Sequence, residues 1–593
     1  MNALLLRRHW VAGALALFIA ILIALPPLWG KIRSGVSLND PVNIRIADEF
    51  FYFARIRDVF DGYPLSGNPY TWEGKADPPG QPVFLGEYLT AEAIRLMGLD
   101  VVAGNVVLDA ILPAAAVLLT YACFLVLTSR RLFAILGTAV LFLFAFPTDF
   151  ARTVSPQTNF LFWLSEFLIL HALLTRDPAP PRRRALILAA AVNFGLLFYI
   201  YPYYWMFYAA FFAIAAVGAL AMGDGVRARA IGWVAGGGVI VALPYFWMLA
   251  RAAMRPEYTE TLRRIGMIET HFPSGAAIIV PAALLLGLAA VLLWRGVLRW
   301  EQRMAFLVAG ALAAVVSVNQ HLLTGRNFEF SSHFYMLALF WFSLFGAYLA
   351  GGLAKERTGW SRSLSAAAGA LAIALVGYAI ASAVPPQYMS ARAELRRYLP
   401  LFKWLNANTA QDSVIYAPDE ISNLAPIYTA NNVFFSSWSR VTLMSDREVL
   451  DRAALSAYGK PVDAEGSVKE VFGTQYLNIA LHTRQENKVR RLLGLEPKPA
   501  VMAPPEALAA IRQRWAEVRA RDLYVQLQPY RVDYVVFDRA RADSLKPPPG
   551  EKLYDQGDFA VWRLHPAPAA SPGSSGAGKS DNLKIRWEPS FTP

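Results

Sequence analysis

The chain has 593 residues, of which 55% are hydrophobic and only 17% are charged, and its formal net charge is +12. Soluble globular proteins carry about a quarter charged residues, so this composition excludes an ordinary soluble protein and indicates an integral membrane protein. The single cysteine, Cys123, excludes a disulfide framework, a cysteine-based zinc site and a Cys-x-x-Cys redox pair.

Apolar stretches long enough to cross a membrane follow one another along the first two thirds of the chain. A transmembrane helix needs about 20 largely apolar residues. The first such stretch, although Arg7 and Arg8 precede it, lacks a small-residue cleavage site, so we expect a retained helix with Trp10 and Trp29 as interface anchors. The eleven predicted spans lie near 10–29, 105–128, 132–147, 159–175, 185–201, 203–222, 230–250, 276–294, 304–320, 333–353 and 363–384.

The basic residues fix the predicted orientation. With the N-terminus in the cytoplasm, five alternate loops carry their arginines on the same side, as the positive-inside rule requires. The basic excess is therefore a topogenic signal beside anionic lipid, and we expect no nucleic-acid partner. We predict a multi-pass protein of the bacterial inner (plasma) membrane whose C-terminal domain is periplasmic or extracellular. The five loops contain Arg130-Arg131, 176–184, 227–229, 295–303 and 355–362.

Three parts are expected along the chain. Residues 1–384 form an α-helical polytopic membrane domain with a long first outer loop at 30–104, and residues 385–565 form a soluble outer-face domain. Residues 566–593, rich in Pro, Gly and Ser at their start, cannot bury a core and are expected to be disordered. The outer domain is predicted to be α/β, with strands at 413–417, 433–435, 532–537 and around 552–564, and helical patterns at 390–408, 445–495 and 504–528.

An acidic pair, Asp48-Glu49, follows the first span closely, and an aromatic stretch with helical spacing comes after it. At this depth a polar acceptor meets a lipid-borne donor, so one carboxylate is a candidate general base and its neighbour a group that tunes or orients it. Arg55 and Tyr52 in the same stretch are candidates for phosphate binding and sugar stacking. The alternative is structural: Asp48 caps a surface helix and Glu49 lies in its first turn.

With these features the sequence resembles the GT-C superfamily of polyprenyl-phosphate-sugar-dependent glycosyltransferases, in particular the bacterial branch similar to protein O-mannosyltransferases and lipid A aminoarabinose transferases. The architecture is similar over nearly the whole chain, whereas the Asp48-Glu49 motif is short. The resemblance implies a catalytic role for Asp48, support from Glu49 and basic residues that hold the donor phosphate. The sequence departs from the oligosaccharyltransferase branch of the superfamily, because it contains no Trp-Trp pair. The nearest segment is Ser437-Trp438-Ser439.

Polar residues at the end of an apolar span form a second candidate site. Asn319 and Gln320 have hydrogen-bonding groups suited to a sugar, Arg326 suits a phosphate, and His333 adds a donor as the next span begins. An interfacial loop with ordinary helix caps explains the same residues.

Basic residues at 251–275 run against the positive-inside bias and therefore require a reason. A donor phosphate is one, with Arg263, Arg264 and His271 as the candidates. Anionic head groups, or pairing with Glu257, Glu260 and Glu269, are others. 

Two further outer segments contain candidates. Asp149 and Arg152 in the second outer loop suit a site that needs a second acid, although a plain salt bridge or a helix cap is the favoured explanation. Tyr201 and Tyr204, in an aromatic run at the outer end of a helical hairpin, are candidates for stacking on a sugar, and an aromatic interface belt is the alternative.

We therefore predict a membrane glycosyltransferase that transfers a sugar from a polyprenyl-phosphate donor to a glycan, lipid or protein acceptor with inversion. Direct displacement requires no metal, although the acidic pair is compatible with Mg²⁺ or Mn²⁺. One rival is a polysaccharide polymerase or ligase, which would depend on Arg and His of the later loops. The other is a non-catalytic glycan transporter or scaffold, and charges near mid-membrane would favour a transporter.

Overall fold

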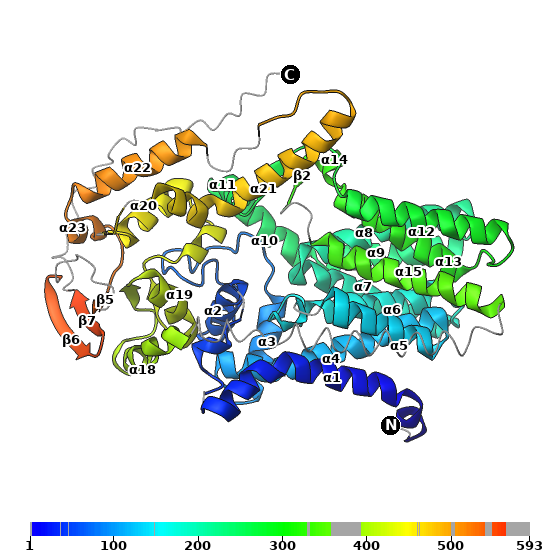
Figure 1. Cartoon of the computed structure of the whole chain (residues 1–593), viewed down its shortest axis with the longest axis horizontal. Coiled ribbons are helices and arrows are strands. Elements are labelled where there is room, and N and C mark those ends of the chain that lie inside the picture. The colour runs from blue at the N-terminus through cyan, green and yellow to red at the C-terminus, as the bar shows by residue number, and fades with distance from the viewer. Residues whose placement is uncertain are drawn as a thin grey trace.

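The structure is a computed structural model, and it is mostly helical where it is described. Figure 1 shows long helices packed side by side at one end and the C-terminal strands and helices at the other, with α2 (Asp48–Phe60) between them. The predicted span 363–384 and the tail 566–593 lie outside the described residues. The structure describes residues 3–35, 37–45, 47–146, 149–328, 333–356, 393–458, 460–461, 463–499, 504–539 and 548–564.

Seven helices in these ranges are long and apolar enough to cross a membrane, and a pair bent by 52° would make eight. The bent pair is α9 (Gly225–Val241) with α10 (Leu243–Ala253), and two shorter apolar helices cover Arg131–Ala145 and Asn159–Leu174. Helices thus occupy every predicted span that falls in the described ranges, and the α-helical polytopic class is confirmed. The long helices are α1 (Ala3–Ser34), α4 (Val101–Thr128), α7 (Pro180–Ile200), α8 (Pro202–Ala221), α12 (Ala276–Trp294), α13 (Gln302–Val318) and α15 (Phe334–Glu356).

Aromatic rings fill the centre of the membrane domain. Trp163 of α6 (Asn159–Leu174) and Trp341 of α15 are fully buried, with ring centroids 6.3 Å apart. The Trp341 indole lies directly against Gly310 of α13, where a Cβ would meet it at 1.6 Å, and its Nε1 donates to the Leu307 carbonyl at 3.0 Å. Gly310 is therefore needed for the close approach of the two helices.

Short elements connect the spans. Helix α2 leads to α3 (Leu85–Leu96), so the loop predicted as the first outer loop is partly helical. The remaining connecting elements are η1 (Pro41–Asn43), α5 (Arg131–Val140), the π-helical turn η2 (Leu141–Ala145), η3 (Asp149–Ala151), α11 (Tyr258–Arg264), β1 (Ile268–Glu269), α14 (His321–Thr324) and β2 (Arg326–Asn327), of which β1 and β2 pair antiparallel.

The C-terminal domain contains a five-stranded mixed sheet in the order β4-β3-β5-β7-β6. Strand β3 (Val414–Tyr416) pairs in parallel with β4 (Asn432–Val433) and β5 (Tyr534–Asp538), while the hairpin β6 (Gly550–Gln556) and β7 (Phe559–Leu564) adds antiparallel strands. The predicted α/β class is confirmed. Its helices are η6 (Ala393–Tyr398), α18 (Leu399–Asn408), α19 (Asp419–Tyr428), η7 (Ser437–Val441), α20 (Asp446–Ser456), α21 (Ala464–Leu492), α22 (Pro505–Arg519) and α23 (Leu523–Leu527).

The first outer loop and the C-terminal domain share one hydrophobic core. Phe53 and Ile56 of α2 are buried in the same cluster as Ile421 of α19 and Leu401 of α18. The Val433 N–H of β4 also donates to the Tyr70 carbonyl of the loop at 2.7 Å. The loop is thus a packed layer, and it holds α2 in a fixed position between the two domains.

Candidate active site

Asp48 is the first residue of α2. The helix begins after Ala47, and no side chain caps its first turn. Glu49 is only 2% exposed, and its carboxylate accepts the Arg45 backbone N–H at 2.5 Å. Asp48 is therefore not the helix cap, and its carboxylate, whose side chain is 48% exposed, faces other partners.

Arg152 of the second outer loop is the partner of Asp48. Its Nη1 lies 3.3 Å from Oδ2 of Asp48, and its Nε donates to the Ser155 carbonyl at 2.6 Å. Burial lowers the pKa of Arg152, but electrostatic effects of Tyr52, Tyr201, Asp48 and Asp149 outweigh burial and raise the pKa overall. Burial raises the pKa of Asp149, against the opposing effect of Arg152. The guanidinium is thus firmly cationic.

Aromatic residues from the α7–α8 hairpin surround this pair. The Tyr201 hydroxyl and Nδ1 of His333 are hydrogen-bonded at 2.6 Å, and the Tyr201 and Tyr204 rings lie 5.1 Å apart. Tyr201 and Tyr52 both act electrostatically on Arg152. The structure therefore brings together candidates that the sequence places in four separate segments.

A buried polar network beneath Asp48 fixes the two outer loops to each other. Arg45 pairs with Asp109 of α4 at 3.0 Å, and the Gln157 amide donates to the same carboxylate at 2.6 Å. Val154, in the second of these loops, has φ = 63°, a left-handed conformation that a β-branched residue adopts only where its surroundings impose it. The network makes the position of the Asp48–Arg152 pair well determined.

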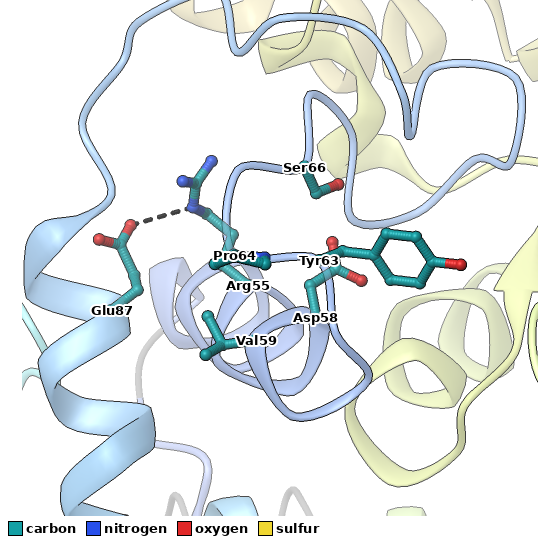
Figure 2. A pocket seen from close by; sticks show the side chains of 7 residues that line it. All are labelled: Arg55, Asp58, Val59, Tyr63, Pro64, Ser66 and Glu87. Atoms are coloured by element: carbon teal, nitrogen blue, oxygen red, sulfur yellow. Dashed lines mark ion pairs between the residues drawn. The ribbon is translucent and has the colours of Figure 1, made fainter. Parts of the chain in front are cut away.

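Arg55 lies outside this arrangement. Its Nε pairs with Oε1 of Glu87 at 3.1 Å, and its Nη2 donates to the Val83 carbonyl at 3.1 Å. Figure 2 shows Arg55 and Glu87 beside a cavity that Asp58 and Tyr63 also line. The cavity holds about 10 Å³, which is enough for one water molecule and far too little for a sugar. Arg55 therefore joins α2 to α3.

Arg263 and Arg264 have different surroundings. Arg264 is fully buried, pairs with Asp446 at 2.5 Å and donates to the carbonyls of Arg440, Thr442 and Met444. Its guanidinium links α11 to the C-terminal domain and is not accessible to a phosphate. Arg263 is exposed and lies 3.6 Å from Glu269, which is the pairing that the sequence offers as the alternative.

The candidates around α14 form a unit of their own. Asn319 accepts the Ser274 N–H at 2.9 Å, Gln320 donates to the Arg326 carbonyl at 2.7 Å, and His271 is bonded to the Leu322 carbonyl at 3.0 Å. Arg326 itself is exposed in β2. These side chains stabilise the turn, and Figure 1 places α14 well apart from α2.

In the described ranges no group of three or more His, Cys, Asp or Glu side chains has the arrangement of a metal site. The residues around Asp48 thus supply carboxylates but no closed set of protein ligands for a metal. The chemistry they support is proton acceptance by a half-exposed carboxylate next to a cation that can bind an anion.

One residue of the C-terminal domain that was not a candidate from the sequence, Trp438, lies near α2. The Trp438 ring is 6.3 Å from the Phe51 ring. The only signal in the sequence is the isolated Trp438 between two serines, because the approach of η7 to α2 depends on domain packing.

The fold and this site define a multi-pass membrane protein with a charged site between two loops of its membrane domain and a C-terminal α/β domain. No family model matches the sequence, and no curated protein matches it. The chain is similar to the solved apo form of the Archaeoglobus fulgidus oligosaccharyltransferase, with 13% identity over 89% of this chain and 69% of that chain and a TM-score of 0.43.

A second solved form of that enzyme, tethered to an acceptor peptide with the NVT sequon, aligns with 12% identity over 90% of this chain and 69% of that chain, at a TM-score of 0.41. The archaeal oligosaccharyltransferase AglB from the same organism, in complex with an inhibitory peptide and a dolichol-phosphate, aligns with 13% identity over 91% of this chain and 70% of that chain, at a TM-score of 0.39. The superfamily and its branch named from the sequence stay a prediction.

Proposed function

We propose that the chain is a membrane glycosyltransferase of the GT-C type, which transfers one sugar from a polyprenyl-phosphate carrier to an acceptor at the outer face of the bacterial inner membrane. The observation that carries the proposal is the Asp48–Arg152 pair, a half-exposed carboxylate 3.3 Å from a guanidinium at the outer end of the membrane domain. An acceptor hydroxyl needs a base, and a lipid phosphate leaving group needs a cation. The pair offers both.

In the proposed reaction Asp48 accepts the proton of the acceptor hydroxyl while that oxygen bonds to the anomeric carbon. The bond between the anomeric carbon and the phosphate oxygen breaks, and its electron pair leaves with the polyprenyl phosphate. Arg152 stabilises the charge that grows on this phosphate, which is where the transition state differs most from the bound substrate. A single displacement inverts the configuration of the sugar.

The surrounding residues position these two groups. Glu49 fixes the start of α2 through the Arg45 N–H and so holds the backbone of Asp48 in place. Tyr52 and Tyr201 are partly exposed and suited to stacking on a sugar, and His333 orients the Tyr201 hydroxyl. Tyr204, predicted from the sequence as a stacking residue, is only 1% exposed and packs against Tyr201 instead, so it cannot contact a sugar.

The test compares surface glycans by mass spectrometry in cells that carry wild type, Asp48→Asn or a matched control at equal membrane abundance. The control is Asp77→Asn, because Asp77 and Arg255 form another outer carboxylate–arginine pair at 3.3 Å. We expect Asp48→Asn to lower the transfer of a single sugar at least about a hundredfold and Asp77→Asn to leave it intact. If the glycans were unchanged with Asp48→Asn, the assignment of Asp48 as the general base would be wrong.

A further inference from the structure

A second cavity lies at the end of the membrane domain opposite Asp48. It holds about 230 Å³, many times the room that one water molecule needs. Arg183 in the first turn of α7 lines it, and the 21 residues of this helix span about 30 Å before they end next to Tyr201 of the proposed site. The cavity is therefore about one hydrocarbon thickness away from that site, on the face that the positive-inside rule predicts to be cytoplasmic.

One arginine builds the wall of this cavity. The Nη2 of Arg227 in α9 pairs with Asp177 at 2.8 Å, its Nη1 pairs with Asp224, and its Nε donates to the Leu174 carbonyl at 2.8 Å. Arg227 thus ties the end of α6 and the loop after it to the start of α9. Asp177 and Asp224 are the acidic residues that line the cavity, and both are committed to this arginine.

The other two arginines of the lining, Arg176 and Arg183, are in a different position. Neither has an ion pair with any residue of the described ranges. Arg176 is exposed and Arg183 is half-buried, so a ligand can reach both. The two connecting segments here, 175–185 and 222–230, contain six arginines and only two acidic residues. The cavity therefore lies in an excess of positive charge and favours an anion.

The remaining lining is apolar and continues into a lipid-facing surface. Leu173 and Ala230 are buried, whereas Val226 is 46% exposed. Two turns farther along the same face of α9, Trp233 is 70% exposed, and the adjacent α7 exposes Leu188. Large apolar side chains that are exposed on a span are in contact with acyl chains. A ligand with its charged group on the arginines can thus lay an apolar chain along α9.

We propose that this cavity binds an anionic phospholipid of the inner leaflet, with Arg176 and Arg183 on its phosphate and its acyl chains along the exposed face of α9. Basic pockets between membrane helices on the cytoplasmic side bind anionic lipid head groups. The proposal does not depend on sugar transfer, because the cavity and Asp48 lie at opposite ends of the spans.

The experiment measures the affinity of the purified full-length protein, in a neutral detergent, for dioctanoyl phosphatidylglycerol. The rise in melting temperature with lipid concentration gives the affinity, since a ligand that binds only the folded state stabilises it. Dioctanoyl phosphatidylcholine has the same chains and a phosphate but no net charge, and inorganic phosphate is an anion without chains. We expect phosphatidylglycerol to stabilise wild type, and the other two to have little effect at the same concentration.

Arg176→Gln together with Arg183→Gln should weaken the affinity for phosphatidylglycerol about tenfold to a hundredfold, the range for charged hydrogen bonds. The matched control is Arg182→Gln together with Arg184→Gln, because these exposed arginines belong to the same segment and do not line the cavity. The control removes the same charge, and its affinity should stay within about fivefold of wild type. Ala230→Leu fills part of the cavity with every arginine in place, and it should weaken the affinity as well.

Each affinity comes from one variant with and without lipid, so a change in basal stability does not obscure it. Equal losses in the two double variants would mean that positive charge alone attracts the lipid, and they would overturn the site. An unchanged affinity in Ala230→Leu would do the same, because the lipid would then lie outside the cavity. Equal stabilisation by phosphatidylcholine would contradict the role of the arginines, and stabilisation by inorganic phosphate would assign them to a soluble anion.

Discussion

The two ends of α2 carry the same chemistry in opposite settings. At its start, Asp48 and Arg152 form a single pair with side chains that are 48% and 26% exposed. Ten residues later, Asp58 and Lys75 are each 5% exposed, and the Lys75 ammonium also binds Asp412 of the C-terminal domain at 3.0 Å. The first pair can accept a substrate, whereas the second is closed by its neighbours.

This difference separates the proposed substrate site, the Asp48–Arg152 pair, from a structural ion-pair cluster of Lys75, Asp58 and Asp412, which we call the joint. Lys75 also donates to Asn432 at 3.1 Å and lies over the Tyr63 ring at 4.3 Å, so the cation has partners on several sides. A buried charge that is fully partnered stabilises an arrangement, and one with open sides is available to bind. We therefore expect changes at the joint to affect stability, and changes at the start of α2 to affect transfer.

The largest expected effect is at the joint. Lys75→Met leaves Asp58 and Asp412 without their shared cation, which should destabilise the protein by about 3–5 kcal/mol, the range for breaking a buried ion pair. Thermal unfolding in detergent measures it, with Lys552→Met as the control because Lys552 is exposed and pairs only at the surface. A loss below about 1 kcal/mol would mean that the joint does not hold the two domains together.

Removal of the Arg152 cation should have the next largest effect, on transfer. Arg152→Gln leaves the departing phosphate without its charge-assisted hydrogen bond, so we expect sugar transfer to fall about tenfold to a hundredfold with little change in melting temperature. Arg255→Gln, from the matched Asp77 pair, should keep the wild-type rate. Equal losses in both variants would remove the contrast between Arg152 and an ordinary outer arginine.

The pH dependence of stability tests the joint in another way. Burial raises the pKa of Asp58 to about 6, although Lys75 opposes it and the nearby Asp61 adds to it. The folded protein therefore binds this proton more tightly than the unfolded chain, so this contribution to the free energy of unfolding is present at low pH and is lost as the pH rises through about 6.

Asp58→Asn removes that titration. Relative to wild type, its free energy of unfolding should improve as the pH rises from about 4 to about 6, by up to about 1.4 kcal/mol per pH unit. The pKa of Asp412 is lowered by Tyr63, Lys75 and Asn432 against the effect of burial, so its contribution has the opposite sign and disappears as the pH falls. Parallel pH profiles for Asp58→Asn and Asp412→Asn would contradict this assignment.

The smallest expected effect is at Tyr201. Tyr201→Phe removes the hydrogen bond to His333 and keeps the ring, so transfer should fall only about two- to tenfold. Tyr201→Leu should reduce it further if the ring stacks on a sugar. Equal rates for the two variants in the transfer assay would argue for a structural role of the ring position.

The sequence predicts the fold well because hydropathy reports directly on the membrane. The spans at 203–222 and 276–294 match α8 and α12 within a few residues, and the short strands of the outer domain fall where β-branched and aromatic runs predict them. Bends are less visible: the interruption between α9 and α10 lies inside one continuous apolar run.

The candidate site is only partly accessible from sequence. Asp48 and Arg152 are found because polar residues in outer loops are informative, but their pairing depends on how two loops fold together. Arg264 shows the converse, since its sequence position next to Arg263 gives no sign that the outer domain buries it. The contact of Trp438 with Phe51 of α2 was not predicted, because it depends on how the C-terminal domain packs beside the first loop.

The central claim is that Asp48 and Arg152 act in one chemical step, and a double-mutant cycle tests it most directly. Sugar transfer would be measured in membrane vesicles for wild type, Asp48→Asn, Arg152→Gln and the double variant at equal abundance. Two residues that act as a unit give non-additive losses, so we expect the double variant to be about as slow as Asp48→Asn alone. Losses that multiply, or a fully active Asp48→Asn, would contradict the account.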